Sequence, residues 1–234
     1  MLSFRPFALH WDIDSLMFPL SLINYFELGA FLISLWVYPN LRGTALRPFP
    51  FFLGFIVLTE FAARTIRVVL LQPDTELNII FTSAGFIFYA FIFRGALQHL
   101  AFRRMVAVFM IVYPLLVVTD LFFIQGFPPQ HSYTQSLGAV FMILFCCCFF
   151  YELLLNPVEE QLRRDPMFWI STGILFFYLG SLSYNLLFNF LEQYAVGEGR
   201  RLFQSINNNL ILILYTCFIK AFLCKRSLRK SSLQ

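Results

Sequence analysis

Charged residues are scarce in this 234-residue chain and make up only 13% of it. Soluble domains carry about a quarter charged residues, so the composition argues against an ordinary aqueous surface. Hydrophobic residues account for 59% of the chain, phenylalanine alone occurs 32 times, and the mean hydropathy is +0.72. This balance predicts a protein whose solvent is lipid.

The sequence also lacks the patterns that catalysis and metal binding require. No HExxH, GxSxG or paired-Asp motif occurs, so we expect no enzyme activity. The five cysteines form no CxxC pair and the three histidines lie far apart, which predicts neither a metal nor another cofactor. The net charge of +4 comes from short basic clusters beside apolar runs. Such clusters are typical of membrane topology signals and not of nucleic-acid binding.

Seven apolar stretches each approach the roughly 20 residues that a membrane-spanning helix needs. They cover residues 15–38, 49–71, 77–97, 105–124, 133–155, 167–191 and 205–223. The connections between them are short, and all except residues 98–104 contain Pro or Gly. Because unpaired backbone groups are costly in hydrocarbon, each span should be a helix. We predict an all-α polytopic membrane protein, with residues 1–234 forming a single seven-helix transmembrane domain.

Basic residues predict the orientation of these spans. Ten of them fall on the side that holds the first, third and fifth turns and the C-terminus, against three on the other side. The larger group is Arg42, Arg47, Arg103, Arg104, Arg163, Arg164, Lys225, Arg226, Arg229 and Lys230. The positive-inside rule then predicts an outside N-terminus and a cytoplasmic C-terminus.

Charged and amide side chains gather inside the spans, where ionisable groups are costly and indicate a functional site. Glu27 and Glu60 fall near mid-membrane in the first two spans. Arg64 and Arg67 follow on the helical face of Glu60. Other candidate ligand-binding residues lie toward the outer ends of later spans: Asp120, Tyr133, Asn185, Asn189 and Asn208. Together they predict a polar, outward-facing pocket with Glu27 and Glu60 at its floor, suited to a polar or anionic small molecule.

A structural role stays open for the same residues, because a buried Glu–Arg pair or interhelical Asn bonds can serve packing alone. Arg94, Glu152 and Lys220 fall near the cytoplasmic ends, where we expect them to extend toward the membrane interface. Gly173 and Gly180 lie seven residues apart on one face of the sixth span. That spacing predicts close approach of a neighbouring helix.

The second half of the chain carries a family resemblance. SYTQSLG opens the fifth span, PMFWISTGILFFYLGS runs into the sixth, and INNNLILILY begins the seventh. These segments resemble an uncharacterised family of small bacterial seven-helix membrane proteins. The matching positions are Tyr133, Thr134, Pro166, Phe168, Trp169, Ile170, Gly173, Gly180, Ser181 and Asn208. Where that family often has a carboxylate in its third helix, this chain has Gly85.

Members of that family look like gene neighbours of histidine kinases and response regulators. The resemblance therefore implies a sensor or signalling accessory protein in the bacterial inner membrane, acting through a separate partner such as a histidine kinase. The main alternative is a small-solute transporter or channel, although spans 1–3 and 5–7 show no convincing internal repeat. An intramembrane enzyme and a passive assembly factor are further alternatives.

Overall fold

The computed structural model describes residues 22–41, 43–65, 75–120, 133–155, 165–194 and 198–231. Their regular secondary structure is helical, with turns or irregular backbone at residues 43–48, 97–99 and 165. The α-helices are α1 (Leu22–Val37), α2 (Phe49–Thr65), α3 (Thr75–Ala96), α4 (Leu100–Thr119), α5 (Tyr133–Leu155), α6 (Pro166–Tyr194) and α7 (Glu198–Ser231). A short 3-10 helix, η2 (Tyr38–Leu41), follows α1. The predicted all-helical fold with seven long helices is confirmed for this part of the chain.

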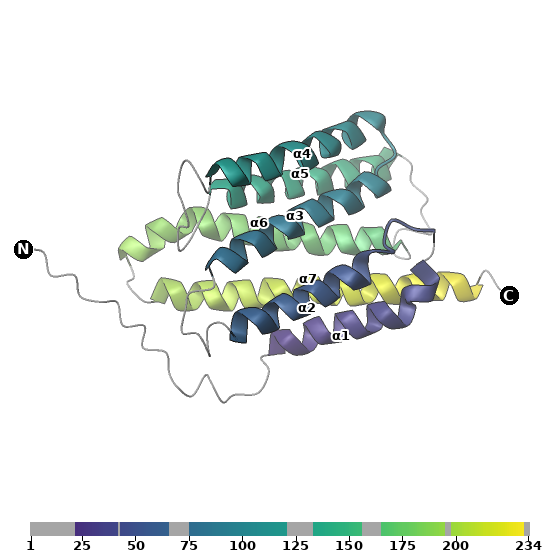
Figure 1. Ribbon diagram of the computed structural model, residues 1–234, viewed down its shortest axis with the longest axis horizontal. Helices are drawn as coiled ribbons and strands as arrows, with labels where there is room; N and C mark the ends of the chain where they lie inside the picture. The colour runs from purple at the N-terminus through teal and green to yellow at the C-terminus, as the bar shows by residue number, and fades with distance from the viewer. Residues whose placement is uncertain are drawn as a thin grey trace, which may run out of the picture.

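Successive helices alternate in direction, so the bundle has two distinct ends (Figure 1). We call the end where α1 begins and α2 ends the carboxylate end, because Glu27, Glu60 and Asp120 lie toward it. The end where α2 begins and α7 ends is called the basic end. Helix α6 packs most extensively against α7, α7 also packs against α1, and α4 packs against α3 and α5. Helices α1 and α4 therefore lie on opposite sides of the bundle (Figure 1).

Apolar side chains both fill the bundle and cover its outside. Phe49 of α2 forms edge-to-face contacts with Phe218 and Phe222 of α7, at centroid distances of 5.0 and 5.6 Å. Phe52 of α2 stacks on Phe88 of α3 at 3.8 Å. Many large apolar side chains face outward, including Leu58, Phe61, Ile111, Leu115 and Leu154. An apolar exterior of this extent is costly in water and favourable in lipid.

Five helices contain segments long and apolar enough to cross a membrane. The segments are Leu22–Leu41, Leu100–Thr119, Thr134–Leu155, Pro166–Ser183 and Ser205–Lys225. Helices α2 and α3 contribute shorter apolar segments, Phe49–Ala63 and Ile80–Ala96. Together with the apolar exterior, these segments identify a membrane-embedded helical bundle.

The bounds of two helices, α4 and α7, differ clearly from the prediction. Helix α4 begins at Leu100 and not at residue 105, so Arg103 and Arg104 are among its first five residues and do not lie in the preceding loop. Helix α7 extends beyond 205–223 at both ends, to Glu198 and Ser231. The predicted limits marked where the sequence stops being apolar, whereas Glu, Lys and Arg continue a helix readily outside lipid. The predicted fifth span, 133–155, coincides with α5.

Small residues on α6 allow α7 to approach closely, as predicted. A Cβ atom at Gly173 would lie 2.8 Å from Cys217 Cβ, and one at Gly180 would lie 2.6 Å from Leu210 Cδ1. Both distances are below normal van der Waals contact, so these two positions leave no space for a larger side chain. These glycines lie on the most extensive helix–helix contact of the described bundle.

Candidate functional site

A hydrogen bond at the carboxylate end joins the first and last helices of the bundle. The Tyr215 hydroxyl of α7 donates to the Glu27 carboxylate of α1. Glu27 is 8% exposed and Tyr215 is 5% exposed, so the bond is shielded from solvent. It lies on the α1–α7 contact, where an unpaired carboxylate would be costly.

Glu60 adds a second carboxylate to this cluster. It lies on α2, half-buried, and interacts electrostatically with both Glu27 and Tyr215. Two nearby carboxylates repel each other when both are charged, so the cluster favours a bound proton, a cation or a hydrogen-bond donor between them. We call Glu27, Glu60 and Tyr215 the carboxylate cluster. It connects three helices through polar groups inside an apolar bundle.

Asp120 takes part in a separate polar contact on the opposite side of the same end. It is 5% exposed at the end of α4 and accepts a 3.0 Å hydrogen bond from Thr134 Oγ1 of α5. This hydrogen bond joins α4 to the adjacent helix α5.

Buried tyrosines occupy the space between these two polar contacts. Tyr89 of α3 and Tyr178 of α6 meet edge to face, with ring centroids 6.4 Å apart. Phe86 of α3 then stacks against Tyr178 at 5.2 Å and contacts Tyr113 of α4 at 5.4 Å. Tyr215 and Tyr113 in turn interact electrostatically with Glu27 and Asp120 respectively. Sequence reasoning missed these tyrosines, because an isolated Tyr in an apolar span is indistinguishable from other aromatic core residues.

The remaining predicted site residues are placed only in part. Asn208 is exposed on α7, so its side chain does not enter the carboxylate cluster. The side chains of Arg64, Tyr133, Asn185 and Asn189, and all of Arg67, lie outside the described residues. A cationic wall and an amide-lined pocket at this end therefore stay predictions.

A cavity of about 470 Å³ lies at the basic end, where none was predicted. The loop before α2, the α3–α4 connection and parts of α3, α5, α6 and α7 line it, and its charged residues are Glu152, Asp165 and Lys225. Glu152 of α5 accepts hydrogen bonds from the backbone N–H groups of Gln98 (2.8 Å) and His99 (2.7 Å). Glu152 was expected only to extend toward the membrane interface; its carboxylate also anchors the α3–α4 connection. The sequence contained one indication of a specific role for Glu152, because it is the only acidic residue among the apolar residues 141–155.

Asp165 caps the start of α6 beside this cavity. Its Oδ1 accepts a 2.9 Å hydrogen bond from the backbone N–H of Met167. Burial raises the pKa of the Asp165 carboxyl above its ordinary value, while the Met167 N–H and the positive charge of Lys225 act in the opposite direction. Lys220, one turn earlier on α7, is exposed with its Nζ 4.0 Å from the ring centroid of Trp169.

No family model, curated protein or solved structure matches this chain. Within the described residues, no group of three or more His, Cys, Asp or Glu side chains is arranged to hold a metal ion. The carboxylate cluster and the basic-end cavity, at opposite ends of the bundle, are therefore the two candidate sites.

Proposed function

We propose that this protein is a membrane sensor or signalling accessory protein, in which the carboxylate cluster receives the signal and α7 carries it to a separate partner. The observation that carries this proposal is the buried Tyr215–Glu27 hydrogen bond. It connects α7 to α1, and Glu60 of α2 interacts electrostatically with both bonded residues. A ligand or proton that competes for Glu27 would weaken the connection and free α7 to shift.

The length of α7 suits it to this task. Its 34 residues extend over about 51 Å, which exceeds the roughly 30 Å hydrocarbon core of a bilayer. The same continuous helix holds Tyr215 and the basic sequence Lys225, Arg226, Arg229 and Lys230. These four residues add positive charge to the last turns of α7, which is complementary to an acidic surface of a partner. A histidine kinase encoded nearby is the partner that the family resemblance suggests.

The described part of the cluster favours a ligand that donates hydrogen bonds. Glu27 and Glu60 supply acceptor oxygens, and Tyr215 is the only donor among the three side chains. The anionic ligand suggested by the sequence would require Arg64 and Arg67 to face this cluster. We retain a polar small molecule as the proposed ligand. The carboxylate cluster would offer such a molecule directional polar contacts both without the two arginines and with them facing the cluster.

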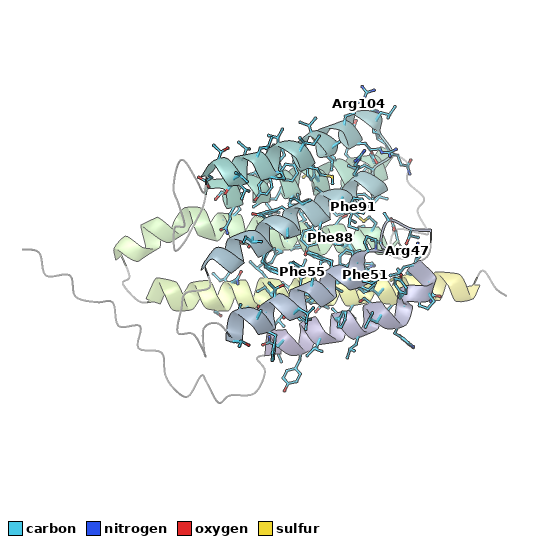
Figure 2. All side chains as sticks on the ribbon, in the orientation of Figure 1. Arg47, Phe51, Phe55, Phe88, Phe91 and Arg104 are labelled. Atoms are coloured by element: carbon cyan, nitrogen blue, oxygen red, sulfur yellow. The ribbon has the colours of Figure 1, made fainter. Side chains whose placement is uncertain are left out.

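Orientation and location follow from the distribution of basic residues. Arg47, Arg103, Arg104 and Lys225 lie toward the same end of the bundle, and Figure 2 labels Arg47 and Arg104 there. We propose that this basic end faces the cytoplasm, that all seven helices span the membrane, and that the N-terminus lies outside. A bacterial inner membrane is the proposed location.

Affinity purification from native membranes tests the proposed signalling role. The full-length chain and a chain ending at Cys224 would be purified after crosslinking, and bound proteins identified by mass spectrometry. We expect a histidine kinase with the full-length chain and its loss on truncation. A variant with Lys220→Gln, which keeps the basic segment, serves as the control and should retain the kinase.

A transport role is the outcome that would replace the sensor proposal. Uptake of a small solute into proteoliposomes that disappears in Glu60→Gln, with no kinase recovered from membranes, would support a transporter. The buried carboxylates of the cluster are compatible with proton-coupled uptake, which is why this variant separates the two functions.

A further inference from the structure

The cavity at the basic end lies at the depth of lipid headgroups. Four of the five candidate spans begin or end beside it: at Leu100, Leu155, Pro166 and Lys225. Since the hydrocarbon core ends where apolar spans end, the cavity opens at the level of the polar headgroup layer. A lipid headgroup is therefore the molecule that this position meets at highest concentration.

The lining combines apolar walls with charges of both signs. Phe149 and Leu153 of α5, with Met167 of α6, supply apolar surface. Glu152 and Asp165 supply negative charge and Lys225 supplies positive charge. Lys225 continues the buried face of α7 formed by Phe218, Ala221 and Phe222, which directs it inward. A ligand complementary to this lining carries a cation and an anion close together on an apolar body.

We propose that this cavity binds the headgroup of a phospholipid with a primary ammonium group, such as phosphatidylethanolamine. Its ammonium group would contact Asp165 and Glu152, and its phosphate would contact Lys225. The proposal does not depend on the ligand proposed for the carboxylate end. It shares Lys225 with the basic segment of α7 that is proposed to bind a partner.

Hydrogen-bonding capacity favours a primary ammonium over a quaternary one. A carboxylate offers about four lone-pair positions, and the backbone bonds described for Glu152 and Asp165 use two and one of these. The remaining positions can accept N–H bonds from an ethanolamine headgroup, whereas a choline headgroup has no N–H to donate. The cavity volume of about 470 Å³ lies within the range of roughly 300–1,000 Å³ for small-molecule sites. It accommodates a headgroup and leaves the acyl chains in the bilayer.

Native mass spectrometry of the full-length protein in detergent tests this assignment. The delipidated protein would be titrated with phosphatidylethanolamine, phosphatidylcholine or phosphatidylglycerol of identical acyl chains. These lipids share the phosphate, and their headgroups carry a primary ammonium, a quaternary ammonium and no cation respectively. We expect the wild-type protein to bind phosphatidylethanolamine about tenfold more tightly than phosphatidylcholine, the ratio that a charged hydrogen bond provides.

Two variants test whether the preference for phosphatidylethanolamine arises in this cavity. Asp165→Asn retains a side chain that caps α6 well but removes the negative charge, so the preference for ethanolamine over choline should fall to about twofold or less. Lys225→Gln should weaken binding of all three phospholipids about equally. Lys220→Gln, on the same helix but outside the cavity lining, is the matched control and should bind like wild type.

Equal binding of the ethanolamine and choline lipids to the wild-type protein would overturn the proposal. So would an unchanged preference in Asp165→Asn, because the ammonium would then be recognised elsewhere. A thermal melt of each variant in the same detergent establishes that it is folded. If Asp165→Asn does not fold, Asp165→Ser, which also caps a helix, provides the same comparison.

Discussion

Tyr215 and Glu27 are separated by most of the sequence and form a buried hydrogen bond between α7 and α1. The bond closes the bundle by connecting its first and last helices in a region otherwise filled by apolar side chains. Buried polar bonds of this kind are costly to break on one side only, because the remaining partner loses both its bond and its hydration. The pair therefore connects the two helices, and a ligand that competes with Tyr215 for Glu27 would weaken this connection.

Replacement of Tyr215 by Phe should lower the free energy of unfolding by about 1–3 kcal/mol. The ring and its packing stay, while the Glu27 carboxylate loses its donor. Tyr25→Phe is the matched control, since Tyr25 lies on the same helix as Glu27 and is 55% exposed. Thermal or denaturant unfolding in one detergent measures both variants. Equal stability of the two would contradict the described bond.

Replacement of Gly173 by Ala should destabilise the α6–α7 contact by about 1–3 kcal/mol. The added methyl group would lie 2.8 Å from Cys217 Cβ, so the helices must separate. Gly29→Ala in α1 is the control, because no atom lies within 4 Å of the added methyl group. It should be neutral or stabilising by up to about 1 kcal/mol through helix propensity. The reverse order of stabilities in the same unfolding assay would show that α6 and α7 pack differently.

Replacement of Thr134 by Val should loosen the α4–α5 pair. Valine keeps the shape but removes the donor to Asp120, and a cost of about 1–3 kcal/mol is expected for the buried carboxylate. Thr119→Val is the comparison variant, because the Thr119 hydroxyl is exposed and bonds to the Leu115 carbonyl of its own helix. The cost of Thr134→Val should exceed that of Thr119→Val, and melting curves in detergent measure the difference.

The lipid preference of the basic-end cavity should depend on pH. An Asp165 carboxylate attracts an ammonium group only when it is ionised, which holds above its pKa and fails below it. Because burial raises the pKa of Asp165, the preference for phosphatidylethanolamine should decline as the pH is lowered from neutral, and at a higher pH than the ordinary pKa of an aspartic acid would give. Native mass spectrometry at several pH values measures this preference. A ratio that stays constant over these pH values would assign the preference to another group.

Apolar run length made much of the architecture predictable. The fifth span was placed correctly because turn-forming residues bound its apolar sequence at both ends. The ends of α7 were not, since a helix rich in Glu, Lys and Arg continues into water after the apolar pattern stops. Gly173 and Gly180 were predicted to allow close packing, and both face α7. Local pattern was sufficient for features within the apolar part of a single helix, and insufficient where a helix continued beyond it.

Features built from several helices were predicted less completely. Glu27 and Glu60 stood out as acids within apolar spans, but nothing in the sequence near Tyr215 marks it as the partner of Glu27. The basic-end cavity was missed for the same reason. Its charged residues come from three different helix ends, at Glu152, Asp165 and Lys225, and only folding brings these ends together.

Hydrogen–deuterium exchange of residues 225–231 is the most direct test of the central claim, that the carboxylate cluster controls α7. Wild type, Tyr215→Phe and Tyr25→Phe would be compared in lipid nanodiscs. The proposed coupling predicts faster exchange at the basic end of α7 in Tyr215→Phe, with Tyr25→Phe unchanged. Identical exchange in all three proteins would contradict it and would leave the Tyr215–Glu27 bond a local packing contact.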